Sequence, residues 1–191
     1  MSQTEAEYRQ VIAGCKDLFL KKNRDYGTAW RILRLPSLTD QLFIKAQRIR
    51  QIQETGTHRV EEGVVPEFVA LVNYGLMALI QLELADDPRM ELPTDELSEL
   101  YDHQVNLTLE LLLAKNHDYG EAWREMRVSS MTDLILMKIF RTKQIEDNSG
   151  QTLVSEGVDA NYRDIINYAV FCLIKLVVPT GGRSSFWSSS P

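Results

Sequence analysis

A ten-residue stretch in the first half of the chain occurs again, almost unchanged, in the second half. Residues 22–31 read KNRDYGTAWR and residues 115–124 read KNHDYGEAWR, so that eight of the ten positions are identical at an offset of 93 residues. A repeat of this length indicates one supersecondary unit used twice, whose copies stack to bury a shared core. The fold must therefore accommodate two copies of one unit.

Each copy contains three stretches in which apolar residues recur at helical spacing, and neither copy shows the period-two alternation of a half-buried strand. Thr4 followed by Glu7 predicts a capping box at the start of the first helix. The Asp-Tyr-Gly sequence is expected in the loop that follows the first helix of each copy. The predicted helices cover about 5–22, 37–54, 66–84, 95–115, 132–147 and 161–178.

The same pattern predicts how the chain is divided. The first repeat covers 1–84, a linker rich in proline and short acids covers 85–93, and the second repeat covers 94–178. The tail, 179–191, is rich in glycine and serine and is predicted to be disordered. Because a three-helix unit closes a core poorly alone, we expect an all-α fold in which two tandem three-helix repeats pack as one pseudo-twofold helical bundle.

Charge and apolar content restrict the partners and the compartment. A net charge of −6 and a pI near 5.2 argue against non-specific binding to duplex nucleic acid, which requires a basic surface. The N-terminus lacks the basic start and apolar stretch of a secretion signal. The apolar run 169–178 is too short to cross a membrane. We therefore predict a cytoplasmic protein without a membrane partner, whose two cysteines are small buried side chains.

Polar residues interrupt two otherwise apolar helices of the second repeat at intervals of three, which places them on one face of each helix. Antiparallel packing of these helices would bring the two polar faces together. The residues are Lys138 and Arg141 on one helix, with Lys45 and Arg48 in the same places of the first repeat, and Asn161, Asp164 and Asn167 on the other.

Two interpretations of these charges remain open. Removing an ion from water costs several kcal/mol unless the ion is paired, so Asp164 would pair with Arg141 or Lys138 in a structural network. Alternatively, Lys138 and Arg141 hold phosphate oxygens while Glu156 and Asp164 bind a divalent metal, which prefers carboxylate oxygens.

The repeated decapeptide also allows two interpretations. Its tryptophans, Trp30 and Trp123, suit anchors in the core of a rigid connector. Its polar residues Asn116, Asp118 and Tyr119 are expected on a loop, where they are candidates for contacting a base or a sugar.

Three linked motifs, KNxDYGxAWR, TDLILxKxxR and EGxxxNYxDIINYA, resemble the nucleotide modification associated domain family, closely over residues 115–176 and more loosely over 22–82. That family looks distantly similar to the all-α nucleoside triphosphate pyrophosphohydrolases, helical enzymes related to MazG and to dimeric dUTPases. Those enzymes bind magnesium through ExxE on one helix and ExxD on the next, and they release pyrophosphate. The resemblance implies a small-molecule nucleotide as ligand and Mg²⁺ as cofactor, and it leaves a homodimer open.

The chain departs from these metal motifs. Lys138 and Arg141 stand where the first motif has acids, and Asn161 replaces the first acid of the second motif. At an offset of 94, Asp164 aligns with Ala70 and Asn161 aligns with Glu67. A composite metal site across the axis would use Glu67 and Asp164; alternatively, the first repeat has degenerated into scaffold. The leading hypothesis is a nucleotide-binding protein that acts as a metal-dependent pyrophosphohydrolase, with Glu156 and Asp164 as catalytic metal ligands. The alternative is a non-catalytic helical binding or assembly module whose buried ion pairs are structural.

Overall fold

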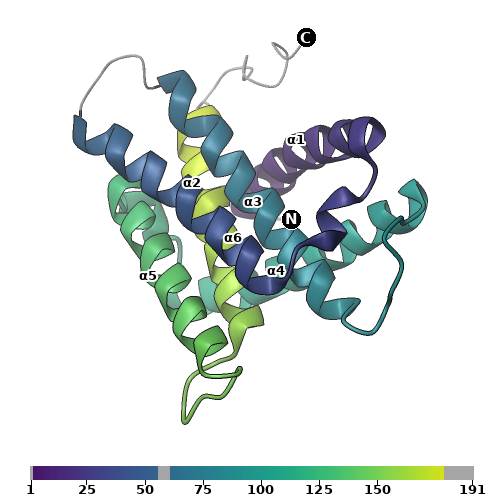
Figure 1. Cartoon of the computed structure of the whole chain (residues 1–191). Coiled ribbons are helices and arrows are strands. Elements are labelled where there is room, and N and C mark those ends of the chain that lie inside the picture. The colour runs from purple at the N-terminus through teal and green to yellow at the C-terminus, as the bar shows by residue number, and fades with distance from the viewer. Residues whose placement is uncertain (1, 56–60, 179–191) are drawn as a thin grey trace.

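The computed structural model describes residues 2–55 and 61–178, except for the side chains of residues 61, 62 and 119. The predicted tail, 179–191, lies outside the described residues. The all-α prediction is confirmed, and no strand occurs in the described part of the chain (Figure 1). The helices are α1 (Gln3–Tyr26), η1 (Ala29–Ile32), α2 (Leu35–Thr55), α3 (Glu61–Glu83), α4 (Thr94–Tyr119), η2 (Ala122–Glu125), α5 (Val128–Asp147) and α6 (Val158–Val177).

Four of the helices form a closed bundle. α2 packs on α3, α3 on α6, α6 on α5, and α5 on α2, while α1 and α4 extend to one side of this group in Figure 1. α1 packs against α4 and α6 as well as α3, so the first helix of one repeat contacts the last helix of the other. Cys15 on α1 and Cys172 on α6 are free and buried, as the sequence predicted.

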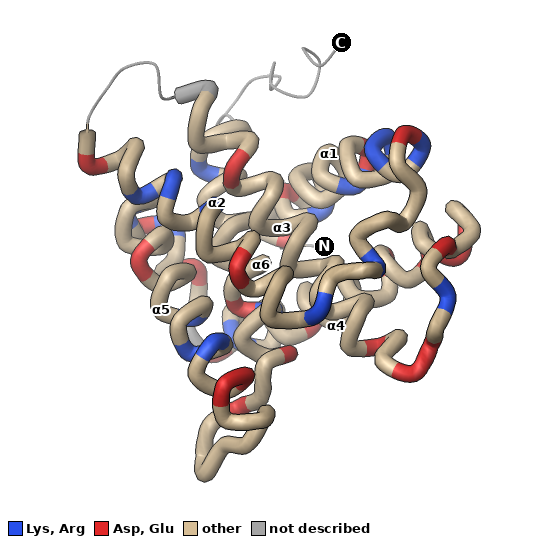
Figure 2. Tube along the Cα trace, in the orientation of Figure 1, with Lys and Arg blue, Asp and Glu red and all other residues tan. Residues whose placement is uncertain are grey.

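α3 is the most apolar helix of the bundle. Its segment Gly63–Glu83 is long and apolar enough to cross a membrane by length and composition, but 72% of the most apolar window is buried inside the bundle. In Figure 2 most of α3 is uncharged, whereas charged residues mark the outer helices and the connections around it. The apolar composition of α3 is therefore explained by its packing against α2, α4 and α6 in the core.

The ends of the first helices differ from the sequence predictions. The cap of α1 is Ser2, whose Oγ accepts a hydrogen bond from the amide of Glu5 at 3.2 Å, so the predicted capping box at Thr4 is wrong. The predicted Asp-Tyr-Gly loop is also wrong, because both copies of Asp-Tyr form the last turn of a helix. Gly27 and Gly120 end these helices with φ of 62°, a conformation that glycine adopts without strain. α3 also begins earlier than predicted, since Pro66 lies inside it.

Reciprocal hydrogen bonds connect the two repeats. The hydroxyl of Tyr8 on α1 donates to Oδ1 of Asn167 on α6, and the hydroxyl of Tyr101 on α4 donates to Oδ1 of Asn73 on α3, both at 3.0 Å. Tyr101 follows Tyr8 by 93 residues, and Asn167 follows Asn73 by 94. The two hydrogen bonds therefore join equivalent positions of the two repeats.

Substitution of Gly75 is expected to disturb the contact between α3 and α6. A Cβ at Gly75 would lie 2.7 Å from Cγ1 and 3.1 Å from Cδ1 of Ile166. Gly75→Ala should therefore lower the free energy of unfolding by about 1–2 kcal/mol, although alanine favours the helix more than glycine does.

Gly63 on the same helix provides the control, because its nearest neighbour would be Cδ1 of Ile52 at 3.7 Å. Gly63→Ala should be neutral or stabilise the protein by up to about 1 kcal/mol. Urea denaturation measures both values, and equal changes in the two variants would contradict the close approach at Gly75.

Candidate functional site

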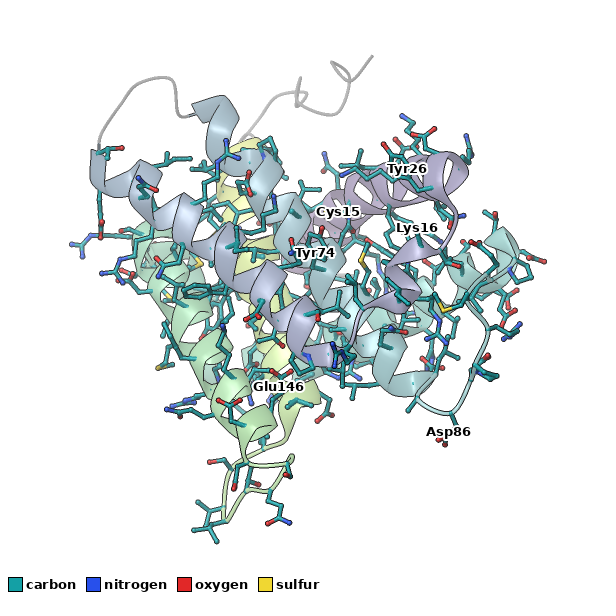
Figure 3. All side chains as sticks on the ribbon, in the orientation of Figure 1. Cys15, Lys16, Tyr26, Tyr74, Asp86 and Glu146 are labelled. Atoms are coloured by element: carbon teal, nitrogen blue, oxygen red, sulfur yellow. The ribbon has the colours of Figure 1, made fainter. Side chains whose placement is uncertain are left out.

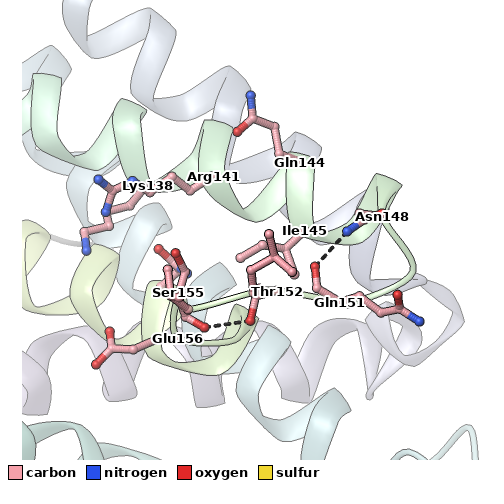
Figure 4. Close-up of a pocket in the computed structure, with 12 residues that line it drawn as sticks. Lys138, Arg141, Gln144, Ile145, Asn148, Gln151, Thr152, Ser155 and Glu156 are labelled. Carbon is pink, nitrogen blue, oxygen red and sulfur yellow. Dashed lines mark hydrogen bonds between the residues drawn. The ribbon is translucent and has the colours of Figure 1, made fainter.

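Four of the predicted site residues line one cavity of about 540 Å³ in the second repeat. We call it the loop pocket, because residues 148–157, which connect α5 to α6, form one of its walls. Lys138 and Arg141 project from α5 toward the segment that carries Glu156 (Figure 4), and Asn161 on α6 also lines the cavity. Arg141 is exposed and makes no ion pair within the described part of the chain. The loop pocket therefore offers one free guanidinium group.

Asp164 lies next to this pocket and is held by two lysines. Nζ of Lys138 is 2.7 Å from Oδ2 of Asp164, and Nζ of Lys115 on α4 is 2.8 Å from Oδ1. Partial burial acts to lower the pKa of Lys115, but its hydrogen bond to Asp164 and the nearby negative charges outweigh this effect and raise the pKa. Asp164 is 8% exposed, so its carboxylate is a buried anion held by the largely buried Lys138 and by the more exposed Lys115.

Glu67 in the first repeat has a similar environment. Nη1 of Arg48 is 3.0 Å from Oε1 of Glu67, and Nζ of Lys45 is 3.3 Å from Oε2. Glu67 is 6% exposed, and its Oε2 is buried without a hydrogen-bond partner in the described structure. Both of the buried acids expected to bind a metal are thus paired with two cations each.

The donors do not fit the Mg²⁺ site expected from the sequence. A divalent cation requires several free oxygen ligands, whereas the carboxylates of Asp164 and Glu67 are already neutralised by lysine or arginine. Glu156 is exposed and belongs to the loop pocket. Among the side chains that the structure describes, no three acidic, histidine or cysteine residues gather into a metal-binding group.

The remaining predicted residues lie away from the loop pocket. Asn167 is 5% exposed and bonded to Tyr8, which gives it a structural role between the repeats. Asn116 and Asp118 lie in the last turn of α4, where Asp118 is exposed. The side chain of Tyr119 lies outside the described residues.

A second cavity, of about 580 Å³, lies in the first repeat between α1, η1, α2 and α3. We call it the motif pocket, because six residues of the repeated decapeptide line it together with Lys45, Glu67 and the Asn73-Tyr74 pair. Figure 3 labels Tyr26 and Tyr74, which line this pocket from the end of α1 and from α3. The residues from the decapeptide are Lys22, Asn23, Tyr26, Gly27, Ala29 and Trp30.

The lining of the motif pocket combines aromatic rings, cations and buried polar atoms. Its aromatic residues include Tyr26, Trp30 and Tyr74, and its lysines are Lys22 and Lys45. Oδ1 of the pocket-lining Asn23 is buried and has no hydrogen-bond partner in the described structure, which is unusual for a native protein. A cavity of this size and composition suits a planar ligand that carries negative charge.

Lys22, Asn23 and Tyr26 were not among the site residues predicted from the sequence. The signal was present, because all three recur unchanged in the second repeat. The candidate site was predicted in the second repeat, where Glu156 and Asp164 suggested a metal site. The structure shows instead that the repeated residues themselves surround an open cavity in the first repeat.

Glu146, close to the loop pocket, gives a pH-dependent prediction. Its Oε1 accepts hydrogen bonds from Thr39 at 2.7 Å and from Tyr162 at 2.9 Å, and its burial raises the pKa above the ordinary value of 4.5. An acid with a raised pKa in the folded state destabilises the fold as pH rises through that pKa. Glu146→Gln should therefore flatten the fall in unfolding free energy as the pH rises above about 4.5.

The first repeat shows that glutamine fits this position. Gln53, which is 93 residues before Glu146, donates from Nε2 to Oγ1 of Thr132 at 3.1 Å, and Thr132 is the counterpart of Thr39. Urea denaturation of both proteins at several pH values measures the effect. A steeper fall in the variant than in the native protein would contradict the prediction.

Comparison with known protein families identifies both repeats. A family model described as nucleotide modification associated domain 1 matches residues 22–82 and 115–176, which together make up well over half of the chain. No curated protein and no solved structure matches the chain. The two matched segments contain the decapeptides, the ion pairs of Asp164 and Glu67, and most of the motif pocket.

Proposed function

We propose that this chain, which belongs to the nucleotide modification associated domain 1 family, binds a nucleotide in the motif pocket. The observation that carries the proposal is the convergence of the repeated residues on one cavity with aromatic and cationic walls. Its volume of about 580 Å³ falls within the usual range for small-molecule sites.

The aromatic residues supply surfaces for a nucleobase. Trp30 and Tyr74 are half-buried and held by the core, whereas Tyr26 is 71% exposed at the mouth of the pocket. Stacking of a base on an aromatic side chain contributes about 1–3 kcal/mol. Tyr26 is therefore the side chain best able to change its contacts when a ligand binds.

The lysines supply local positive charge. The whole chain carries a net charge of −6, so it does not attract phosphates in general. Lys22 and Lys45 nevertheless line the motif pocket, and Arg48 pairs with Glu67 beside it. A local cluster of this kind selects a small anion with a matching ring rather than a nucleic acid backbone.

Hydrolysis of the nucleotide is the extension implied by the resemblance to the pyrophosphohydrolases. It would require a metal held by Glu156 and Asp164, with Lys138 and Arg141 neutralising the departing pyrophosphate. The pairing of Asp164 with two lysines does not favour this step. Binding without turnover is the function that the geometry supports best.

Isothermal titration calorimetry with the common deoxynucleosides and their mono-, di- and triphosphates tests the proposal. The native protein should bind at least one nucleotide, and Tyr26→Ala should weaken that binding about tenfold. Because Tyr26 is exposed, the unliganded variant should keep its thermal stability.

Arg141→Ala is the matched control, because Arg141 lines the loop pocket and not the motif pocket. It should leave the affinity unchanged. No binding by the native protein, or a loss of affinity in Arg141→Ala alone, would overturn the proposed site. Release of pyrophosphate when the same samples are incubated with Mg²⁺ would establish the hydrolase version.

A further inference from the structure

The two repeats place different side chains around an equivalent pair of lysines. In the second repeat, Asp164 lies between Lys115 and Lys138. The counterparts in the first repeat are Ala70 at an offset of 94 and Lys22 and Lys45 at an offset of 93, and all three line the motif pocket. The first repeat thus keeps both lysines and lacks a carboxylate at the position of Asp164, although Lys45 pairs with Glu67, the counterpart of Asn161. The same pair of lysine positions therefore occurs once with an aspartate and once with an alanine at the equivalent place.

The second repeat shows that this pair of lysine positions can hold an anion. Both ammonium groups lie at hydrogen-bonding distance from one carboxylate, 2.8 Å for Lys115 and 2.7 Å for Lys138. Distances of this kind are typical of strong, charge-assisted hydrogen bonds.

In the first repeat the two lysines are less fully engaged. Lys22 is exposed and makes no ion pair within the residues that the structure describes. Lys45 approaches Oε2 of Glu67 only to 3.3 Å, and that oxygen accepts no hydrogen bond. Ala70, which lines the same pocket, is half-buried and carries no polar group. Both ammonium groups can therefore accept a further anionic partner.

We infer that the phosphate of the bound nucleotide lies over Ala70, between Lys22 and Lys45, where the second repeat has the carboxylate of Asp164. This inference rests on the proposed binding of a nucleotide in the motif pocket. It adds to that proposal the position of the phosphate in the motif pocket and the number of nucleotides bound by each chain. Each chain binds one nucleotide, because in the second repeat a side chain of the protein occupies the anion position.

Aromatic packing in the second repeat agrees with a single ligand per chain. Trp123 is 5% exposed and stacks on Phe171, with ring centroids 4.1 Å apart and an interplanar angle of 3°. In the first repeat Met77 stands in place of Phe171 and lines the motif pocket, and Trp30 is only half-buried. The second repeat therefore fills with its own side chains a region that the first repeat leaves open.

Ala70→Asp tests the inference, because it supplies the first repeat with its own carboxylate. Calorimetry compares deoxynucleoside monophosphates with the matching deoxynucleosides. The native protein should bind the preferred monophosphate at least about tenfold more tightly than its nucleoside, at one site per chain. In Ala70→Asp this ratio should fall to about one, because the carboxylate takes the place of the phosphate and repels it.

Ala70→Asn is the control, since asparagine has nearly the same size as aspartate but carries no charge. It should retain a preference for the monophosphate. Lys22→Gln, at an exposed position that does not threaten folding, should reduce the preference independently of Ala70. Ala70→Asp should unfold at a temperature no lower than the native protein, because its carboxylate gains two ammonium partners.

The outcomes separate the two levels of the proposal. If the native protein binds neither nucleosides nor nucleotides, the proposed function and this inference both fail. If it binds them but Ala70→Asp and Lys22→Gln keep the full preference for phosphate, only the phosphate position is overturned. Binding of two nucleotides per native chain would overturn the conclusion that a side chain of the protein occupies the anion position in the second repeat.

Discussion

Asp164→Leu is expected to lower the free energy of unfolding by about 3 kcal/mol, because it leaves the ammonium group of Lys138 without its counter-ion. The side chain of Lys138 is 14% exposed, so water compensates little of this loss. The side chain of Lys115 is 43% exposed and can turn toward solvent. Urea denaturation at neutral pH measures the change.

The companion variant removes both charges. Lys138→Met combined with Asp164→Leu should recover most of the lost stability, because buried ion pairs can often be replaced by apolar side chains without loss. The coupling between the two substitutions should be about 2 kcal/mol in a double-mutant cycle.

Asp118→Asn is a control at an acid whose side chain is 74% exposed, and it should change stability by less than about 0.5 kcal/mol. Neither Asp164 variant should lose affinity for the nucleotide, because the proposed site lies in the other repeat. Equal destabilisation of the single and double variants would show that the Lys138–Asp164 pair is not a structural contact. Loss of nucleotide affinity in the Asp164 variants, with unchanged stability, would place the nucleotide-binding site in the second repeat instead.

The internal repeat made most of the fold predictable from the sequence. The spacing of apolar residues indicated six helices. One of the two interpretations of the polar faces, a pair of Asp164 with Arg141 or Lys138, includes the Lys138–Asp164 contact that the structure contains. Helix ends were less predictable, because Ser2 and Thr4 both suit an N-cap and only packing decides between them. Thr4 is buried and bonded to Glu121, more than a hundred residues away along the chain, and no local pattern reports such a contact.

The site was harder to predict than the fold, because the meaning of a charge depends on its partners in space. Glu67 and Asp164 both looked like metal ligands, yet each lies between two cations supplied by neighbouring helices. The replacement of Asp164 by Ala70 in the first repeat looked like degeneration of a site. In three dimensions Ala70 lines the cavity that the repeated residues surround. From a single sequence, a carboxylate that pairs with the protein's own cations cannot be distinguished from one that binds a ligand.

Asn73→Ala and Asn167→Ala should each lower the free energy of unfolding by about 2–3 kcal/mol, because each removes a buried side chain whose amide bonds two partners. Asn73 accepts from Tyr101, and its Nδ2 donates to the carbonyl of Cys15 at 3.1 Å. Asn167 accepts from Tyr8, and its Nδ2 donates to the carbonyl of Thr108 at 3.3 Å. Both tyrosines are fully buried, so water cannot replace the lost acceptor without rearrangement. Chemical denaturation of the two variants should give similar losses.

Double-mutant cycles test whether these bonds join the repeats. Tyr8→Phe with Asn167→Ala should show a coupling of about 1 kcal/mol, whereas Tyr8→Phe with Asn73→Ala should be additive to within about 0.5 kcal/mol. A ligand-binding role for Asn167 predicts the opposite pattern, with reduced nucleotide affinity and unchanged stability. Because Tyr8 and Asn167 belong to different repeats, neither repeat satisfies its own buried polar groups alone. The native chain should therefore unfold in a single transition, with equal calorimetric and van't Hoff enthalpies.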